Sequence, residues 1–239
     1  MDLTPQSDVL CLEVGGSGRQ FVGFRNGDPR FPELQPSEFV GDLLIAVPGV
    51  VRPDGTVTAE NLGWVEVDPA EALGLDRPAS LVINDAEAAV RGESALRGGI
   101  GTLLYVGLGT GVGGAFLSRG VVECGLVGHL PGFGERQCPC GQVGCLETVA
   151  GGWAMPTALN SSYLDYLAKV VGEGVRRTTV GLAVDVVVVG GGVTHNYPEL
   201  VAGLASQLPG YRVEASVAPD GFKSAAAWGL LDAWNASLQ

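Results

Sequence analysis

A pattern of apolar strand, glycine-rich turn and returning strand occurs twice in this chain, at Glu13–Gly18 and at Gly107–Gly114. Around both copies, apolar runs of strand length alternate with segments of helical periodicity, which is typical of α/β proteins. Glycine accounts for 38 of the 239 residues and lies in clusters between the apolar runs. Glycine in such positions permits tight turns and close approach of the backbone to a ligand. The pattern therefore predicts an α/β protein with two related halves.

The apolar runs and their boundaries place the predicted elements. The predicted strands cover residues 8–14, 20–24, 42–47, 81–84, 102–107, 115–117, 184–189 and 211–218. The predicted helices cover residues 86–95, residues 163–183, a segment from residue 197 onward, and residues 222–234. Residues 97–99 form the predicted linker between the two halves.

The composition restricts the class of protein. Hydrophobic residues make up 46% and charged residues 17% of the chain, which favours a sizeable core over disorder. The net charge of -12 argues against nucleic acid as the main partner, because phosphate neutralisation needs clustered Lys and Arg. The acidic, polar segment at residues 1–8 is not a secretory signal, and no apolar run approaches the length that spans a bilayer. We therefore expect a cytoplasmic protein without a membrane partner.

One histidine and three cysteines give the most specific chemical signal, with His129 preceding Cys138, Cys140 and Cys145. A His/Cys₃ set is a tetrahedral donor set that structural zinc prefers, and four protein ligands leave no open position. The alternative interpretation is a group of buried reduced thiols, since free cysteine is often buried. The chain has only two histidines, and one of them lies beside this cluster, which favours a structural Zn²⁺ site.

Three glycine segments are candidates for holding a nucleotide. Backbone N–H groups in such turns can converge on phosphate oxygens, and a hydroxyl in the turn adds a donor. The alternative is that the glycines serve only the geometry of hairpins and strand-to-helix turns. Both interpretations stay open for each segment taken alone. The candidate residues are Gly15, Gly16 and Ser17, then Gly109, Thr110 and Gly111, and finally Gly190, Gly191 and Gly192.

The dipeptide Asn84-Asp85 lies where a predicted strand runs into a predicted helix. In one interpretation Asp85 caps that helix. In the other, Asp85 is a general base that takes a proton from a substrate hydroxyl as the hydroxyl attacks a phosphoryl group.

Taken together and in order, these motifs resemble the ROK family of sugar kinases and related repressors. The resemblance spans most of the chain, and the cysteine motif is its most specific part. The segments that carry it are Ile45–Gly49, Glu60–Trp64, Ile83–Asp85, Gly109–Gly114, Gly128–His129, Cys138–Glu147 and Val189–Gly192.

The resemblance implies an actin-like, ribonuclease-H-like ATPase fold with two lobes around a cleft. The implied N-terminal lobe covers residues 1–97 and is completed by a C-terminal helix at residues 222–239. The implied C-terminal lobe covers residues 98–221 and carries the zinc knuckle at residues 129–145.

The implied activity is ATP-dependent phosphorylation of a hexose or an N-acylhexosamine, with Mg²⁺ accompanying ATP and with polyphosphate left open as a second donor. Asp85 would be the base, Ser17 and Thr110 would face the phosphates, and Gly191 would face the adenosine. A homodimer is compatible with the family. The implied sugar ligands are Asn61, Asn84, His129 and Glu147.

Two substitutions depart from the family pattern. Glu13 stands where the family has Asp, at a position used to organise Mg²⁺ and phosphate, and Leu126 stands where the family has Glu three residues before the zinc-ligand histidine. The second change removes a charged sugar ligand. An alternative function is therefore a catalytically inactive protein that senses a sugar or a nucleotide. A DNA-binding repressor is disfavoured by the acidic charge and by the lack of a helix-turn-helix segment before residue 8.

Overall fold

The structure, a computed structural model, describes residues 8–16, 18–25, 28–30, 39–125, 127–219, 222 and 224–238. The predicted phosphate ligand Ser17 and the substituted position Leu126 lie outside the described residues. The chain divides into two compact units, one of Met1–Gly99 with Ala225–Gln239 and one of Ile100–Ser224. The predicted boundaries, at residues 97 and 221, lie close to these limits.

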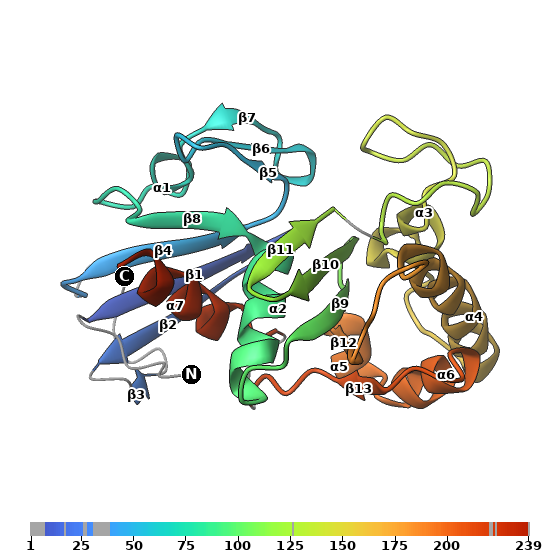
Figure 1. The fold of residues 1–239 in the computed structure, drawn as a ribbon. Coiled ribbons are helices and arrows are strands. Elements are labelled where there is room, and N and C mark those ends of the chain that lie inside the picture. Colours follow the sequence, from blue (N-terminus) through green and yellow to red (C-terminus); the bar gives the residue numbers. More distant parts are fainter. Residues whose placement is uncertain are drawn as a thin grey trace. The chain divides into compact units, whose positions relative to one another are not determined.

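The first unit is built on a five-stranded sheet in the order β3-β2-β1-β4-β8 (Figure 1). The hairpin of β1 and β2 is antiparallel, and β1 also pairs with β4 in parallel. The short strand β3 extends the antiparallel edge, and β8 extends the parallel edge. The strands are β1 (Val9–Gly15), β2 (Gly18–Arg25), β3 (Asp28–Arg30), β4 (Asp42–Val47) and β8 (Leu81–Asn84).

A small three-stranded sheet follows β4 and was not predicted. It consists of β5 (Val50–Val51), β6 (Val57–Ala59) and β7 (Trp64–Val67), and it is followed by the short helix α1 (Pro69–Ala72). Two to four residues are too few to show the alternation by which a strand is recognised in a sequence. Side chains of β6 and α1 pack in one buried cluster with alternate residues of β1 and β4, so this segment covers one face of the main sheet.

Two helices, α2 (Asp85–Leu96) and α7 (Ala226–Ser237), pack against each other, and α7 also contacts β1 and β4. The helices approach so closely that a Cβ atom on Gly92 would overlap the Ala225 carbonyl, and one on Gly229 would overlap the Ala88 carbonyl. The first unit therefore depends on a helix that follows the second unit in the chain. The structure begins this helix at residue 226 rather than at the predicted residue 222.

We expect Gly229→Ala to destabilise the protein by about 2 kcal/mol or more, because the added methyl group meets backbone atoms that cannot turn away. Gly203→Ala, in a helix of the second unit, is the matched control. There the new methyl group would lie 3.2 Å from the Cβ of Ala168, and the gain in helix propensity, about 1 kcal/mol, offsets the contact. Denaturant unfolding measures both. Equal stability of the two variants would contradict the close helix crossing.

The second unit repeats the topology of the first, in the order β11-β10-β9-β12-β13. Its hairpin of β9 and β10 is antiparallel, β9 pairs with β12 in parallel, and the outer strands continue these two patterns. The same strand order with the same pairings confirms the prediction of two related halves. The strands are β9 (Thr102–Leu108), β10 (Val112–Ser118), β11 (Val121–Cys124), β12 (Val186–Gly190) and β13 (Val213–Ala215).

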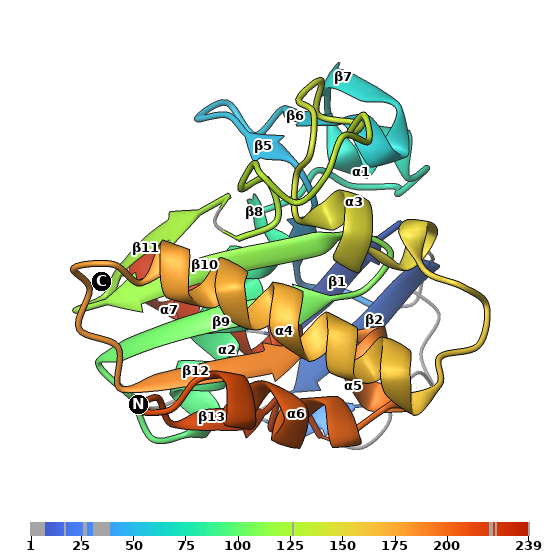
Figure 2. The same cartoon turned by 90° about the vertical axis from the view of Figure 1, so that its right-hand side faces the viewer.

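Helices cover one face of this second sheet, with α4 and α6 lying along it (Figure 2). Alternate residues of β9, Leu104, Val106 and Leu108, point to that face and pack with the apolar sides of α4 and α6. The predicted helix over residues 163–183 is wrong at its end, because α4 stops at residue 178 and Gly181 has a positive φ. The helices of this unit are α3 (Glu147–Ala150), α4 (Ser161–Thr178), α5 (Gly192–Asn196) and α6 (Glu199–Gln207). A short 3₁₀ turn lies at Gly152–Ala154 in this unit, and another lies at Glu60–Leu62 in the first unit.

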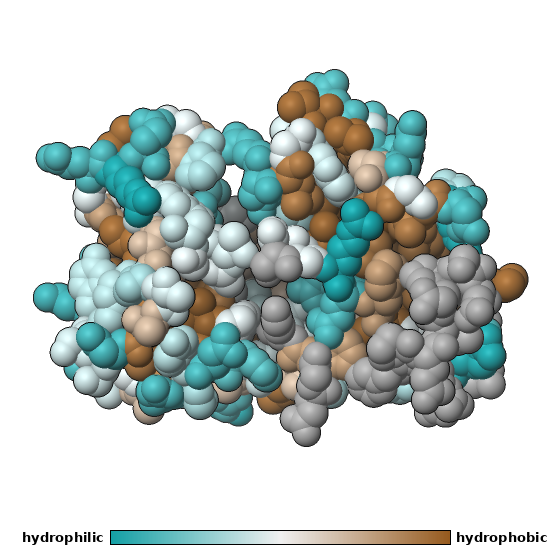
Figure 3. Space-filling model, turned by 180° about the vertical axis from the view of Figure 1, so that it is seen from behind, coloured by the Kyte–Doolittle hydropathy of each residue, from teal (hydrophilic) through white to brown (hydrophobic). Residues whose placement is uncertain are grey.

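The surface mixes polar and apolar residues. On the face shown in Figure 3, hydrophilic and hydrophobic areas are interspersed. Across the described part of the chain, none of the helices is long and apolar enough to cross a membrane.

Candidate functional site

The end of β8 and the start of α2 fix the positions of Asn84 and Asp85. Asn84 is the N-cap of α2: its Oδ1 accepts hydrogen bonds from the N–H groups of Ala86, at 2.9 Å, and Glu87, at 3.2 Å. Its Nδ2 donates to the carbonyl of Gly49 at 2.9 Å. The N-cap position considered for Asp85 therefore belongs to Asn84.

Asp85 is the first residue of α2, and its carboxyl is only partly exposed. One oxygen, Oδ1, accepts a hydrogen bond from the N–H of Ala86 at 2.8 Å. Burial raises the pKa of Asp85 to about 6, and the backbone hydrogen bonds oppose that rise only in part. A carboxylate with a pKa this close to neutral is a better proton acceptor than an ordinary surface aspartate, as a general base requires.

The other residues of interest in the first unit lie in β1, in the turn after it and in the turn between β6 and β7. Asn61 lies in the 3₁₀ turn that joins β6 to β7, and its side chain is exposed. Gly15 ends β1, where it pairs with Gly18 of β2, and Gly16 forms the turn between the two strands. Glu13 lies in β1 beside Ala46 of β4, with its side chain partly buried.

The second glycine turn, Gly109–Gly111, joins β9 to β10 and is held from outside by neighbouring backbone. Gly152 N–H donates to the Gly109 carbonyl at 2.9 Å, and Trp153 N–H donates to the Thr110 carbonyl at 3.1 Å. Within the described residues, the N–H groups of Thr110 and Gly111 have no hydrogen-bond partner. Two free donors on a fixed turn are the arrangement that binds a phosphate.

The structure brings the third glycine segment next to this second turn. Gly191, with φ of 93°, follows β12 and caps the short helix α5. A Cβ atom at Gly191 would lie 2.8–2.9 Å from the backbone carbon and nitrogen of Leu108, the last residue of β9, so only glycine fits there. Gly190 is less restricted, since its Cβ would lie 2.7 Å from the hydroxyl of Tyr105, a side-chain atom that can move. The second unit thus gathers two of the three predicted nucleotide segments at the ends of neighbouring strands.

The predicted metal ligands also come together. The ligand atoms of His129, Cys138, Cys140 and Cys145 all lie within 4.8 Å of one another. Cys138 Sγ lies 3.7 Å from His129 Nδ1, and Cys140 Sγ lies 3.7 Å from Cys145 Sγ. A tetrahedron with metal–sulfur bonds of about 2.3 Å has edges of about 3.8 Å, so the donor set and its spacing fit a zinc ion.

The loop between these ligands is anchored at both ends. The residues where the loop begins pair with those where it ends. Leu146 N–H donates to the Leu130 carbonyl at 2.9 Å, and Glu147 N–H donates to the Gly128 carbonyl at 2.9 Å. Burial raises the pKa values of the Cys138 and Cys145 thiols. A bound metal would therefore have to displace thiol protons.

Glu147, a predicted sugar ligand, makes a contact that the sequence did not reveal. Its Oε2 accepts a hydrogen bond from the N–H of Val112 at 2.8 Å, across 35 positions of the chain. The sequence also did not reveal a contact of Trp153. The centre of its ring lies 4.6 Å from the guanidinium carbon of Arg136, and this contact joins the loop of predicted metal ligands to the segment after α3. Neither contact leaves a local signal, because both partners are distant in the sequence.

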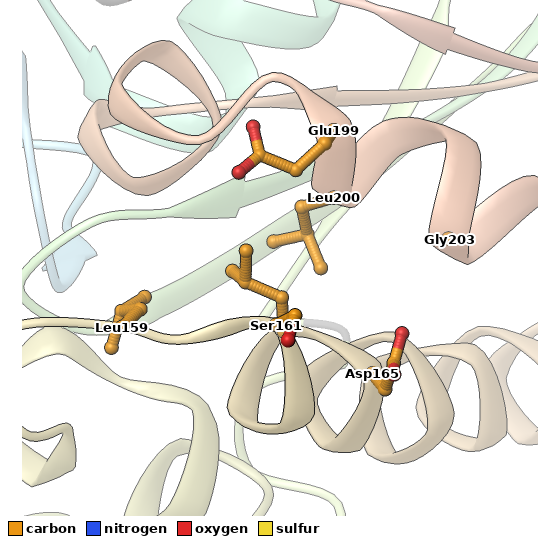
Figure 4. Close-up of a pocket in the computed structure, with 7 residues that line it drawn as sticks. Leu159, Ser161, Asp165, Glu199, Leu200 and Gly203 are labelled. Carbon is orange, nitrogen blue, oxygen red and sulfur yellow. The ribbon is translucent and has the colours of Figure 1, made fainter.

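A cavity of about 290 Å³ lies between α4 and α6, apart from all the predicted site residues (Figure 4). Its polar groups include the carboxylates of Asp165, from α4, and Glu199, from α6. The residues that line it are Leu159, Ser161, Leu164, Asp165, Glu199, Leu200 and Gly203.

The chain is similar to known proteins in both sequence and fold. The sequence model of the ROK family matches residues 32–227. The chain is 36% identical over 128 residues to a kanosamine kinase of Amycolatopsis mediterranei, a match that covers 49% of this chain and 41% of that protein. It is 33% identical over 142 residues to an N-acetylmannosamine kinase of Escherichia coli, covering 54% of this chain and 48% of that protein. The chain thus spans less than half the length of these two relatives.

The fold is similar to that of a ROK family glucokinase from Streptomyces griseus, solved in complex with glucose and AMPPNP. The TM-score is 0.71 at 19% sequence identity, and the match covers 95% of this chain and 99% of that one.

Proposed function

The chain belongs to the ROK family, and from this premise we propose that it is an ATP-dependent sugar kinase that phosphorylates a hydroxyl of a hexose or an N-acylhexosamine. One observation carries the proposal: Asp85, at the end of β8, has a pKa raised to about 6, while Asn84 performs the capping of α2. A general base must accept a proton near neutral pH, and a raised pKa at the end of a strand suits Asp85 to that role.

In the proposed reaction, Asp85 takes the proton of the sugar hydroxyl as the hydroxyl oxygen attacks the γ-phosphorus of ATP. The new bond joins the sugar oxygen to phosphorus, and the bond between phosphorus and the ADP oxygen breaks. The N–H groups of Thr110 and Gly111 would bind the phosphates, and Gly190–Gly192 would lie against the nucleoside. Mg²⁺ bound with ATP would neutralise phosphate charge, with Glu13 as the carboxylate of this chain that serves it.

Asn61, Asn84, His129 and Glu147 are the proposed sugar ligands. His129 would direct Nδ1 to a structural zinc, since this atom lies on the Cys138 side. The opposite nitrogen, Nε2, would then be free for a sugar hydroxyl. In this proposal, zinc fixes the orientation of the imidazole and takes no part in phosphoryl transfer.

The proposal is tested by measuring ADP release from Mg-ATP against a panel that contains glucose, mannose, N-acetylglucosamine, N-acetylmannosamine and kanosamine. We expect sugar-dependent release with at least one of them, and a parallel series with polyphosphate tests the second donor. Folded, zinc-loaded protein that turns over no sugar with either donor would contradict the proposal for this panel.

The alternative function is a sugar or nucleotide sensor, which the substitutions at Glu13 and Leu126 favour. A sensor would show a rise in melting temperature with sugar or nucleotide, by mass action, but no ADP release. The two functions are therefore separated by running thermal shift and turnover on the same samples.

A further inference from the structure

The side chain of Glu147 lies directly against the second glycine turn. Its Oε2 accepts the Val112 N–H bond at 2.8 Å. A Cβ atom on Gly111 would overlap this same oxygen, and the three atoms nearest to that Cβ all belong to the Glu147 carboxyl group. The glycine at position 111 thus makes room for the carboxylate. Its φ lies outside the left-handed region, so the space, rather than the backbone conformation, requires glycine there.

The main chain of Glu147 is fixed in turn. Its N–H donates to the Gly128 carbonyl, and its own carbonyl accepts from Gly151 N–H at 2.8 Å. Gly128 is itself packed against the turn, since a Cβ there would overlap the Val112 carbonyl. The backbone that carries the Glu147 carboxylate is therefore held by hydrogen bonds, one of them to Gly128, which directly precedes the predicted metal ligand His129.

We propose that Glu147 is a positioning residue for the phosphate turn, beyond any contact it makes with the sugar. By holding the Val112 N–H, Oε2 fixes the residue that ends the turn, and the N–H groups of Thr110 and Gly111 then remain directed to the phosphates. The other oxygen, Oε1, has no hydrogen-bond partner among the described residues. This inference rests on the proposed function, because it assumes that the turn binds a nucleotide.

The test measures affinity for Mg-ADP by calorimetry without sugar, so that any contact with sugar plays no part. Glu147→Ala removes the acceptor, and we expect about 10-fold weaker binding or more, the loss typical of a hydrogen bond to a charged group. Glu147→Gln keeps an acceptor oxygen and removes the negative charge near the phosphates. We expect its Kd for Mg-ADP to be within about 3-fold of the wild-type value, or lower. If Glu147 acted only through packing, the two variants would not be separated by whether they keep the acceptor oxygen.

Gly111→Ala gives an independent perturbation, because its methyl group displaces the carboxylate from the turn. We expect a loss of affinity similar to that of Glu147→Ala. The double variant Gly111→Ala/Glu147→Ala should lose no more than either single variant, since both changes break the same contact. Fully additive losses would overturn the inference.

Amide hydrogen exchange at Val112 is the second readout, and it needs no nucleotide. We expect exchange at least about 10-fold faster in Glu147→Ala and unchanged in Glu147→Gln, with the buried Val187 amide of β12 as the control for global unfolding. If the wild-type protein binds Mg-ADP and Glu147→Ala matches it in both affinity and exchange, the inference fails. If the wild-type protein binds no nucleotide but Val112 exchange accelerates in Glu147→Ala, the proposed function fails and the positioning of the turn by Glu147 stands.

Discussion

Replacing Asp85 with asparagine is expected to lower kcat for sugar phosphorylation by about 10²–10⁴-fold, the usual contribution of a general base. Asparagine has the same shape and can still accept the hydrogen bond from Ala86 N–H, so the start of α2 should keep its structure. The measurement is single-substrate kinetics with the best sugar of the panel. A matched control is Asp76→Asn, an exposed aspartate of the same unit, for which we expect full activity. Equal kcat in wild-type protein and Asp85→Asn would exclude Asp85 as the base.

The pH dependence gives a second test of the same residue. Because burial raises the pKa of Asp85 to about 6, the carboxyl is protonated below that pH and cannot accept a proton. We expect kcat/KM to fall as the pH drops through about 6 and to level off above it. A kcat/KM that does not change between pH 5 and pH 7 would contradict the raised pKa. The pH profile of Asp85→Asn identifies the changes in kcat/KM that come from other ionisable groups.

Raising the pH has the opposite effect on the stability of the protein to the one it has on activity. A carboxyl whose folded pKa lies above its ordinary value of 3.8 binds its proton more tightly in the folded state. Its contribution to stability is therefore present at low pH and is lost as the pH rises from about 4 to about 6. Asp85→Asn removes this loss, so the variant should be at least as stable as the wild-type protein at pH 7.5. A less stable variant would indicate a structural role for the charge.

Loss of the metal is the second change with a large expected effect. We expect the purified protein to carry one zinc ion per chain, and we expect Cys140→Ser or a strong chelator to remove it. Metal binding to a structural site contributes directly to folding. Since the loop is also anchored by backbone hydrogen bonds, the loss should be several kcal/mol rather than the roughly 10–16 kcal/mol of zinc-finger peptides. Elemental analysis and thermal unfolding measure the two effects.

Cys124→Ser is the control for the metal site, because Cys124 lies on β11 outside the cluster. This variant should keep its zinc and its melting temperature within a few degrees. Wild-type protein that contains no zinc and unfolds at the same temperature with and without chelator would favour the alternative of a thiol cluster without metal.

Two strands and the His/Cys₃ cluster could be predicted from the sequence for clear physical reasons. The strands at residues 42–47 and 81–84 agree with β4 and β8 in both bounds, because each is an apolar run that ends in a turn or helix signal. The clustering of His129, Cys138, Cys140 and Cys145 could be predicted because a histidine and three cysteines at short spacing are typical of a metal site.

Other features depend on contacts that a sequence does not display. The strands β5–β7 are too short to show periodicity, and their pairing is set by the fold around them. At the end of β8, either Asn84 or Asp85 is suited to cap α2 by residue type, and only the geometry assigns the cap to Asn84. The bond from Val112 to Glu147 joins positions 35 residues apart. Its nearest trace in the sequence is Gly111, and a glycine in a hairpin turn is equally expected for the geometry of the backbone alone.

The close crossing of α2 and α7 has a consequence for how the protein is made. The ribosome synthesises α7 after the whole of the second unit, and yet α7 packs on β1, β4 and α2 of the first. Domains usually fold in the order in which they emerge, but here the first unit stays incomplete until the second has been translated. During that interval the surface of α2 around Gly92 is not covered by α7. The unit synthesised first is therefore the last to be completed, and we expect it to be the more prone to aggregation in the growing chain.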